Sequence, residues 1–300
     1  IDMEIYISIF TPTYNRAHTL PKLYESLLLQ QDKHFEWIIV DDGSTDITEI
    51  LIRQWIEENK ISINYVKQQN GGKHIAINTG VSVAKGELFF IVDSDDYLLD
   101  NALVIIKEEW GKVKKLPNFE NFLGISGHRI TEQGQIIGNS FPEKILDTDM
   151  SSLRYKFYVS GDKAEVFKTN ILRKHPFPKV KDEKFCSEGI IWHRLSEFYI
   201  IRYLEVGFYV CKYLPGGLTD NSVSLRYSSP IYSTMLYSTI VLNKKIPFLG
   251  RIKAAVNFWR FSSSITDKIN CYNLPSWVII FYPFGKIFTL IDKIKLNEKI

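Results

Sequence analysis

The chain has 300 residues, of which 45% are hydrophobic and 24% are charged, and its formal net charge is +3. This is the composition of a globular protein, so disordered, collagen and low-complexity classes are excluded. The sequence contains no uncharged apolar run of 18 residues, so we predict no membrane span. The small positive charge gives no reason to expect a nucleic-acid partner. Three widely spaced cysteines and the lack of a signal peptide before Met3 lead us to expect a cytoplasmic protein.

The first hundred residues alternate between predicted strands and helices. Short apolar runs predict strands over residues 5–11, 37–40, 61–66 and 87–92. Apolar residues at helical spacing predict helices after Thr19, after the turn at 41–44 and over residues 73–84. Strands separated by helices predict an α/β fold with a mostly parallel sheet. Ligands of such sheets bind beyond the carboxyl ends of the strands, where we therefore look for the site.

The remaining two thirds of the chain form two further predicted parts. Residues 111–225 are mixed, with strands expected over 124–131, 164–167 and 200–213 and a helix over 190–199. Residues 226–300 are rich in aromatic residues and lysine and are interrupted by prolines. We therefore divide the chain into residues 1–110, residues 111–225 and a basic, helical C-terminal extension over 226–300.

Acidic residues follow two of the predicted strands. Asp41 and Asp42 come after the second strand, and Asp93, Asp95 and Asp96 come after the fourth. Three carboxylates within four residues repel one another unless a cation neutralises them. Hard oxygen ligands suit Mg²⁺ or Mn²⁺. The alternative is that these residues cap turns and helices.

A glycine pair opens the predicted helix over residues 73–84. Gly71 and Gly72 let the backbone approach a ligand, a helix N-terminus attracts phosphate, and Lys73 adds a positive charge. Neither the P-loop spacing nor the Rossmann glycine spacing is present. A plain loop with a solvated lysine is the alternative, and a ligand contact of His74 stays open.

Four sequence blocks together resemble glycosyltransferase family 2. They are Thr-Pro-Thr-Tyr-Asn-Arg over 11–16, Val-Asp-Asp-Gly-Ser over 40–44, the Gly-Gly-Lys-His block over 71–80 and the Asp-Ser-Asp-Asp block over 85–96. Their order and spacing match the family over residues 4–110. The resemblance implies a GT-A fold, with residues 1–110 as the nucleotide-sugar-binding half and residues 111–225 as the acceptor-side half.

The resemblance also implies an activity. It is the inverting transfer of a sugar from a nucleotide-sugar donor to a hydroxyl group, with Mn²⁺ or Mg²⁺ as cofactor. A UDP-sugar is the favoured donor, with GDP- and dTDP-sugars as alternatives. A saccharide or lipid-linked saccharide would be the acceptor, in bacterial cell-surface polysaccharide synthesis.

Carried over by position, the resemblance implies a donor site at the first two strand ends. Pro12 and Tyr14 would line the nucleobase pocket. Asp42 would accept a hydrogen bond from the base, and Asp41 would support the turn. The implied donor site also contains Thr11, Gly72 and Ser94.

The fourth strand end would hold the metal and the diphosphate. The resemblance implies that Asp95 binds the metal directly, while Asp93 reaches the ribose or the water shell of the metal. In an extended segment these two carboxylates would point to the same side. Lys73 would lie near the diphosphate, and Asn78 would hold the loop and the helix together.

The general base of the family is an acid that opens a helix about 90 residues after the metal motif. Glu188 matches the first acid of that motif, but Gly189 stands where a second acid is usual. An inverting transferase needs such a base to take the proton of the acceptor hydroxyl. The alternative is that Ser187 caps the helix and Glu188 only favours its first turn. Asp182 and Glu183 are then the substitutes.

Two rival functions remain. A non-catalytic sugar- or nucleotide-binding module is the first, and Gly189 is the residue that favours it. A nucleotidyltransferase would need a glycine-rich phosphate loop after the first strand, where this chain has Pro12 to Asn15. Asp220 and Asn221, in a glycine-containing loop, are candidates for closing over the donor or for a plain surface loop.

The last fifty residues carry eight lysines and arginines against three acids, a net charge of +5. They contain an apolar, aromatic run over 277–284 that is too short to span a bilayer. Two interpretations stay open. Residues 270–296 lie at a membrane interface as a peripheral anchor, or they pack on the catalytic domain with a solvated basic face.

Overall fold

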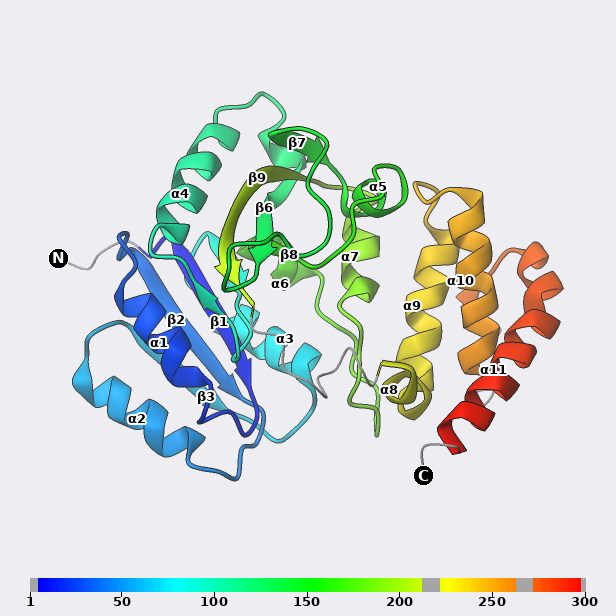
Figure 1. Ribbon diagram of the computed structural model, residues 1–300, viewed down its shortest axis with the longest axis horizontal. Coiled ribbons are helices and arrows are strands. Elements are labelled where there is room, and N and C mark those ends of the chain that lie inside the picture. The colour runs from blue at the N-terminus through cyan, green and yellow to red at the C-terminus, as the bar shows by residue number, and fades with distance from the viewer. Residues whose placement is uncertain (1–4, 212–221, 263–271, 298–300) are drawn as a thin grey trace. The chain divides into compact units, whose positions relative to one another are not determined.

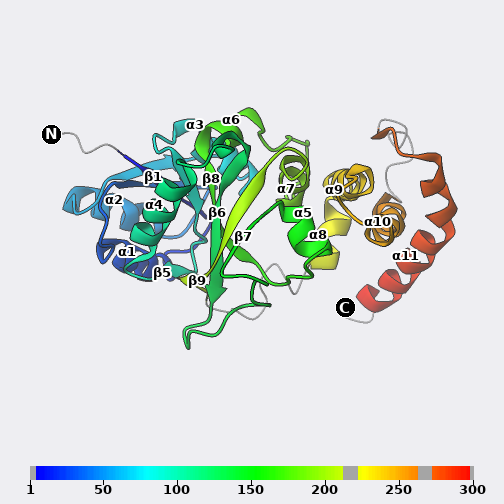
Figure 2. The same cartoon turned by 90° about the horizontal axis from the view of Figure 1, so that it is seen from above.

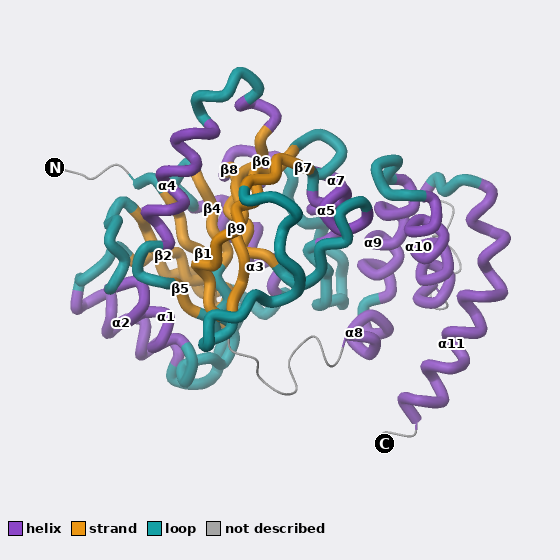
Figure 3. The backbone as a smooth tube through the Cα atoms, turned by 45° about the horizontal axis from the view of Figure 1, so that its top comes forward, coloured by secondary structure: helices purple, strands orange, loops and turns teal. Residues whose placement is uncertain are grey.

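The computed structural model describes residues 5–211, 222–262 and 272–297, which divide into two compact units. Unit 1 contains residues 5–149, 159–177 and 199–211, and unit 2 contains the other described residues. All strands of the described residues lie in unit 1, whereas unit 2 is helical (Figure 3).

The elements of unit 1 form one sheet and its covering helices. The strands are β1 (Ile7–Thr13), β2 (Phe35–Asp41), β3 (Ile63–Lys67), β4 (Leu88–Ile91), β5 (Tyr97–Leu98), β6 (Phe122–Ile130), β7 (Ile145–Thr148), β8 (Lys163–Lys168) and β9 (Ile200–Val210). The helices are α1 (Leu20–Leu28), α2 (Thr48–Glu58), α3 (Lys73–Val83), α4 (Ala102–Val113), α6 (Thr169–Lys174) and the 3₁₀ helix η1 (Phe119–Asn121).

The strand order is β3-β2-β1-β4-β8-β6-β9-β5, and β7 also pairs with β9. The first four strands are parallel (Figure 1). β8 joins β4 and β6 in antiparallel pairing, while β9 runs parallel to β6. The predicted α/β fold is therefore confirmed, with four adjacent parallel strands in the first half of the sheet.

Side chains of the central strands alternate between two buried faces, as the two-residue period of a strand requires. On one face, Ile9, Trp37 and Phe90 pack in the core formed with α1, α2 and α4. The intervening Phe10 and Phe89 are fully buried on the other face and stack on each other at 5.2 Å. In Figure 2, α3 and α6 lie on the opposite side of the sheet from α1. Strands buried on both faces explain why the sequence shows unbroken apolar runs.

The chain reverses direction across the sheet between β3 and β4. From β1 it moves outward to β2 and β3, and α3 then carries it back to β4 on the other side of β1. A sheet that changes direction in this way opens a crevice at the carboxyl ends of its strands. The loops that follow β1, β2 and β4 meet at that edge.

The observed boundaries of β1 to β4 differ from the predicted ones by one or two residues at both ends. β1 was expected to end before Pro12, yet it continues to Thr13, and Pro12 lies opposite Val40 of β2. Pairing of β1 with β4 stops at Phe10, so Pro12 has a ladder neighbour on one side only. A strand tolerates proline where an N–H is not needed for pairing. The predicted helix over 190–199 is shorter, and the end of the strand predicted over 200–213 lies outside the described residues.

Unit 2 consists of helices that pack side by side. They are α5 (Met150–Tyr155), α7 (Gly189–Leu195), α8 (Ser222–Ser228), α9 (Pro230–Leu242), α10 (Phe248–Phe261), the 3₁₀ helix η4 (Ser276–Phe281) and α11 (Tyr282–Asn297). α10 packs against both α9 and α11. The buried Asn243 amide donates to the His193 carbonyl at 2.9 Å and to the Ser196 hydroxyl at 3.1 Å, which joins the end of α9 to α7. Within the described part of the chain, no helix is long and apolar enough to cross a membrane.

Helix α3 approaches β1 closely through Gly80. A Cβ atom at this position would lie 2.3 Å from the ring of Phe10, which is itself fully buried. Gly111 on α4 is the opposite case, because a Cβ atom there would have no neighbour within 4 Å. The two glycines share a helical setting and differ in the space around them.

We predict opposite effects on stability for alanine at these two glycines. Gly80→Ala should lower the free energy of unfolding by about 1–3 kcal/mol, since the core beneath α3 would be overpacked. Gly111→Ala should raise it by up to about 1 kcal/mol, because alanine favours the helix. Urea denaturation of both variants measures the difference. A Gly80→Ala protein as stable as the unmodified chain would contradict the close packing of α3 on β1.

Candidate donor and metal site

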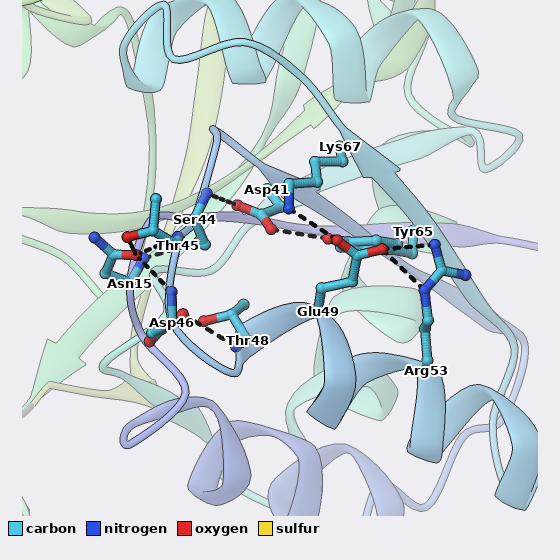
Figure 4. A network of polar contacts seen from close by, with 10 residues as sticks. All are labelled: Asn15, Asp41, Ser44, Thr45, Asp46, Thr48, Glu49, Arg53, Tyr65 and Lys67. Carbon is cyan, nitrogen blue, oxygen red and sulfur yellow. Dashed lines mark hydrogen bonds and ion pairs between the residues drawn. The ribbon is translucent and has the colours of Figure 1, made fainter.

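The carboxyl end of β2 holds the first loop of the site in place (Figure 4). The fully buried Asp41 accepts hydrogen bonds from the Ser44 N–H at 2.7 Å and from the Tyr65 hydroxyl at 2.8 Å. Burial and this hydrogen bond raise the pKa of Tyr65 well above its usual range. The predicted supporting role of Asp41 in the turn agrees with this geometry.

Asn15 ties the loop after β1 to the loop after β2. Its Oδ1 accepts the Thr45 N–H at 2.8 Å and the Asp46 N–H at 3.4 Å. Its own N–H donates to the Ser44 hydroxyl at 2.8 Å. Asn15 has φ of 54°, a left-handed conformation that asparagine adopts more readily than most residues. The two loops are therefore one hydrogen-bonded structure.

Asp42 holds the glycine loop that opens α3. Its Oδ1 accepts the Gly71 N–H at 2.9 Å and the Gln68 side-chain amide at 2.8 Å, and its Oδ2 accepts the Gly72 N–H at 2.8 Å. Gly72 has φ of 93°, which requires glycine, and it directly precedes Lys73. The Asp42 side chain is buried, so organisation of the loop is its visible role in the structure.

Asp93 and Asp96 lie at the two ends of a turn after β4, where Asp96 N–H donates to the Asp93 carbonyl at 3.2 Å. Lys73 Nζ lies 2.6 Å from Asp93 Oδ1. Arg129 of β6 lies 3.2 Å from Asp93 Oδ2 and 3.6 Å from Asp96 Oδ2. Tyr209 of β9 donates to Asp96 at 2.8 Å. Two cations and a phenol therefore surround the acidic turn.

The environment of the turn separates the pKa values of its acids. Burial alone would raise the pKa of Asp93, but Lys73 and Arg129 outweigh burial and hold it well below its usual range. Burial, followed by the negative charge of Asp93, raises the pKa of Asp96 to about 6. Arg129 opposes that rise only in part. Asp93 is therefore a permanent carboxylate of the site.

Asp95 is the acid of the turn that is left for a ligand. It is half-buried, and among the described residues no hydrogen bond or ion pair holds its carboxylate. The described part of the chain contains no group of three histidine, cysteine or acidic residues that could enclose a metal. One or two carboxylates nevertheless fit a Mg²⁺ or Mn²⁺ site completed by phosphate oxygens and water. The carboxylates of the turn fit a metal site of this kind, which phosphate oxygens and water complete.

The extended geometry expected for this segment is not observed. β4 ends at Ile91, and residues 94–95 form a turn, so the two-residue period of a strand does not govern Asp93 and Asp95. The hydrogen bond that closes the turn makes the segment bend instead. The buried Ser94, with 7% of its surface exposed, faces into the protein.

The structure places the other predicted donor residues at different depths. Tyr14 is half exposed and Pro12 is partly exposed, so both reach the surface at this edge. Thr11 is fully buried and accepts a hydrogen bond from the Trp37 indole at 2.9 Å, which makes it a core residue. His74 is also buried, and burial lowers its pKa to about 4 against the opposing charge of Asp42.

Asn78, which was expected to hold the loop and the helix together, pairs with the segment after α6. Its side-chain amide donates to the Phe177 carbonyl at 2.9 Å, and its oxygen accepts the Phe177 N–H at 2.8 Å. This pairing fixes α3 to the segment after α6. The predicted closing loop with Asp220 and Asn221 lies outside the described residues.

The candidate base Glu188 belongs to unit 2, at the N-cap position of α7, and is half-buried. Its neighbour Gly189 lies close to α9, because a Cβ atom there would be 3.0 Å from the end of the Leu236 side chain. A side chain at position 189 would need only a small shift of the terminal methyl group of Leu236. Glu183 is committed elsewhere, since its two carboxylate oxygens accept the N–H groups of Ile231 and Tyr232 at 2.8 and 2.9 Å.

Arg129, Tyr209 and Asn15 are the functional candidates that the sequence did not reveal. Arg129 and Tyr209 are 36 and 116 residues from Asp93 along the chain, and the sheet pairing of β6 and β9 brings them together. A basic residue in an apolar strand such as Arg129 was the one available signal, since a buried arginine needs an acidic partner.

Residues 8–115 match the family described as Glycosyl transferase family 2. The match covers the four sequence blocks and the two loops of the site that follow β1 and β2, together with the turn after β4. The prediction of glycosyltransferase family 2 is confirmed over these residues.

Two relatives extend this finding. A GalNAc(5)-diNAcBac-PP-undecaprenol β-1,3-glucosyltransferase of Campylobacter jejuni is 27% identical over 214 residues, which are 69% of this chain and 62% of the relative. The glycosyltransferase GlyG of Streptococcus pneumoniae is 37% identical over 108 residues, which are 36% of each chain. This chain therefore spans less than two thirds of either relative.

Solved structures share the fold. Residues 1–349 of S. aureus TarS, in complex with UDP-GlcNAc, superpose with a TM-score of 0.64 at 19% identity, covering 93% of this chain and 79% of that TarS 1–349 chain. The mannosyltransferase PcManGT of Pyrobaculum calidifontis, in complex with GDP-Man and Mn²⁺, gives a TM-score of 0.53 at 16% identity. It covers 97% of this chain and 88% of that protein. At this identity the likeness supports the GT-A fold alone.

We predict that Asp42→Ala loosens the glycine loop. The change removes an acceptor from the Gly71 and Gly72 N–H groups and should lower the free energy of unfolding by about 1–3 kcal/mol. Hydrogen exchange at these two amides should become faster, while the amides of β2 keep their protection. Unchanged exchange at Gly71 and Gly72 would show that Asp42 does not hold the loop.

Proposed function

We propose that this chain, whose residues 8–115 form a glycosyl transferase family 2 domain, moves a sugar from a UDP-sugar to a hydroxyl group of a saccharide acceptor. The observation that carries the proposal is the acidic turn at the end of β4. There Asp95 is available to a cation, while Lys73 and Arg129 place positive charge beside Asp93.

The donor side of the proposal rests on charge at a helix N-terminus. Lys73 is the first residue of α3, and the N–H groups of a helix start favour a bound phosphate. A leaving nucleoside diphosphate gains negative charge in the transition state, so fixed positive groups that face it lower the barrier. Lys73 would supply this charge by turning from Asp93 to the diphosphate, and Arg129 would remain with Asp93.

Asp95 would hold a divalent metal, with Asp93 reaching its water shell or the ribose. When bound, Mn²⁺ or Mg²⁺ neutralises charge on the diphosphate as a Lewis acid. The one-carboxylate donor set of Asp95 suits a metal that shares its coordination with phosphate oxygens. Tyr14 and Pro12 would contact the nucleobase, because both reach the surface beside the loop held by Asn15.

Glu188 would act as the general base on the acceptor side. It would take the proton of the acceptor hydroxyl while that oxygen attacks the anomeric carbon from the face opposite the diphosphate, which inverts the configuration. Glu183 is a weaker candidate because both of its oxygens cap α9. A non-catalytic binding module is the alternative, favoured by Gly189 where a second acid is usual.

The acceptor class rests on the relatives. The Campylobacter jejuni relative is named for a saccharide on undecaprenol pyrophosphate. A Trichomonas vaginalis relative, 28% identical over 158 residues, is named a dolichyl-phosphate β-glucosyltransferase. We therefore propose a lipid-linked acceptor for this chain, in the synthesis of a cell-surface polysaccharide at the cytoplasmic side of a membrane.

We predict that Asp95→Ala abolishes metal-dependent donor binding. Without this carboxylate the metal loses its direct protein ligand, so Mn²⁺ should no longer strengthen UDP binding. Isothermal titration of UDP with and without Mn²⁺ measures the effect. Asp100→Ala is the matched control, since it removes an exposed acid five residues away. Unchanged UDP affinity of Asp95→Ala in the presence of Mn²⁺ would sink the metal assignment.

We predict that Glu188→Gln lowers turnover by about 10²–10⁴-fold, the usual contribution of a general base. Glutamine keeps the size of the side chain but cannot take a proton, so the KM for the donor should change little. Steady-state transfer and donor hydrolysis are the measurements. Glu197→Gln, an exposed position beyond α7, is the control and should keep full turnover. Turnover of Glu188→Gln within about threefold of the unmodified chain would move the role to Asp182 or Glu183.

A further inference from the structure

Helix α11 of unit 2 buries its polar side and exposes its apolar side, which is the reverse of an ordinary surface helix. Its buried positions are Gly285, Thr289 and Asp292, which are small or polar. Apolar residues occupy the other side. A helix of a water-soluble protein normally buries its apolar stripe and exposes its polar face.

Specific contacts fix this orientation. Gly285 lies so close to α10 that a Cβ atom would be 2.4 Å from Trp259. Thr289 donates to the Arg260 carbonyl at 2.8 Å. Asp292 receives two hydrogen bonds from the Arg260 guanidinium, at 2.5 and 2.7 Å, and a third from the Tyr227 hydroxyl at 2.7 Å. The polar face of α11 is therefore the face that packs against α10.

The opposite side of the segment carries exposed apolar residues, and we call this set the outer face. Its members are between 39% and 64% exposed: Ile280, Phe284, Ile287, Leu290, Ile291 and Ile294. At about 100° per residue, the α11 members lie roughly opposite Gly285, Thr289 and Asp292. An exposed apolar surface of this extent marks an interaction site.

The charges beside the outer face indicate what kind of partner binds it. Lys286 and Lys293 border the outer face on one side and Lys295 on the other, by the same helical geometry. The acid of α11, Asp292, faces inward and is paired with Arg260. A second copy of the helix would place lysines against lysines. An anionic lipid surface satisfies both the apolar face and its basic border.

We infer that η4 and α11 form an interfacial anchor that lies in the plane of an anionic membrane with the outer face inserted. The anchor needs neither donor nor metal and would place the catalytic unit on the surface that carries a lipid-linked acceptor. This inference goes beyond the proposed transferase activity, and its test contains no sugar.

Co-sedimentation of the full chain with vesicles tests the anchor. We expect binding to vesicles of phosphatidylcholine with phosphatidylglycerol at low salt, weakening as salt rises, and much less binding to phosphatidylcholine alone. The double variant Ile287→Ser and Ile294→Ser should lower the partition coefficient about tenfold or more. The matched control is Leu29→Ser with Ile50→Ser, two residues of unit 1 that are even more exposed than Ile287 and Ile294, and this variant should bind as the unmodified chain does.

A second variant separates charge from apolar insertion. Lys293→Glu with Lys295→Glu should reduce binding to the anionic vesicles and leave the weak binding to neutral vesicles unchanged. The inference is overturned if the full chain does not bind anionic vesicles at low salt, or if Ile287→Ser with Ile294→Ser binds normally. Sedimentation velocity gives a third decisive result. Self-association that depends on Ile287 and Ile294 would assign the outer face to a second copy of the chain.

Discussion

The acidic turn after β4 depends on one guanidinium that lies beside two carboxylates, of which Asp96 is buried and Asp93 is partly exposed. Asp93 and Asp96 lie close enough that their negative charges oppose each other, and Arg129 reaches both. Removing the guanidinium would leave two neighbouring negative charges in a poorly solvated place without their shared cation. The position of β6 in the sheet, which supplies Arg129, is therefore as important to the site as the acids themselves. The sheet is continuous from β3 to β9, so strands of its second half support a turn of its first half.

Hydrogen bonds that backbone N–H groups donate to side-chain oxygens build the rest of the site. Asp41 fixes its own turn, and Asp42 reaches across to the loop that opens α3. Asn15 connects the loops after β1 and β2 in the same way. Loops that would otherwise move separately are thus held to one another before any ligand arrives. Preorganisation of this kind lowers the entropic cost of binding, because the loops are already ordered.

The sequence predicted the parallel half of the fold well because its signals are local. Apolar runs such as Trp37 to Val40 are buried on both faces, and a glycine with positive φ marks the start of α3. Acids at strand ends then identify the edge of the sheet that holds the site. All of these features lie within a few residues of the element they describe.

Two of the features that could not be predicted depend on contacts between distant segments, and one is a local turn. Arg129 and Tyr209 lie beside Asp93 because β6 and β9 pair with each other in the same sheet, although both are far from β4 along the chain. The bend at Ser94 replaced the expected extended segment because Asp96 closes a turn onto Asp93. The orientation of α11 was equally hidden, since the periodicity of its apolar residues is the same whether that face points inward or outward. Its contacts with Arg260 and Trp259 decide the direction.

The ion pair between Lys73 and Asp93 has a consequence for how two ligands influence each other. In the structure the two charges neutralise each other at 2.6 Å. An anion that draws Lys73 away leaves Asp93 with one cationic neighbour fewer, and its carboxylate then attracts a cation more strongly. By thermodynamic linkage the reverse holds by the same factor, so a bound cation makes Lys73 more available to an anion. A single lysine that switches partners would thus couple nucleotide and metal as positive heterotropic effectors, without any movement of the sheet.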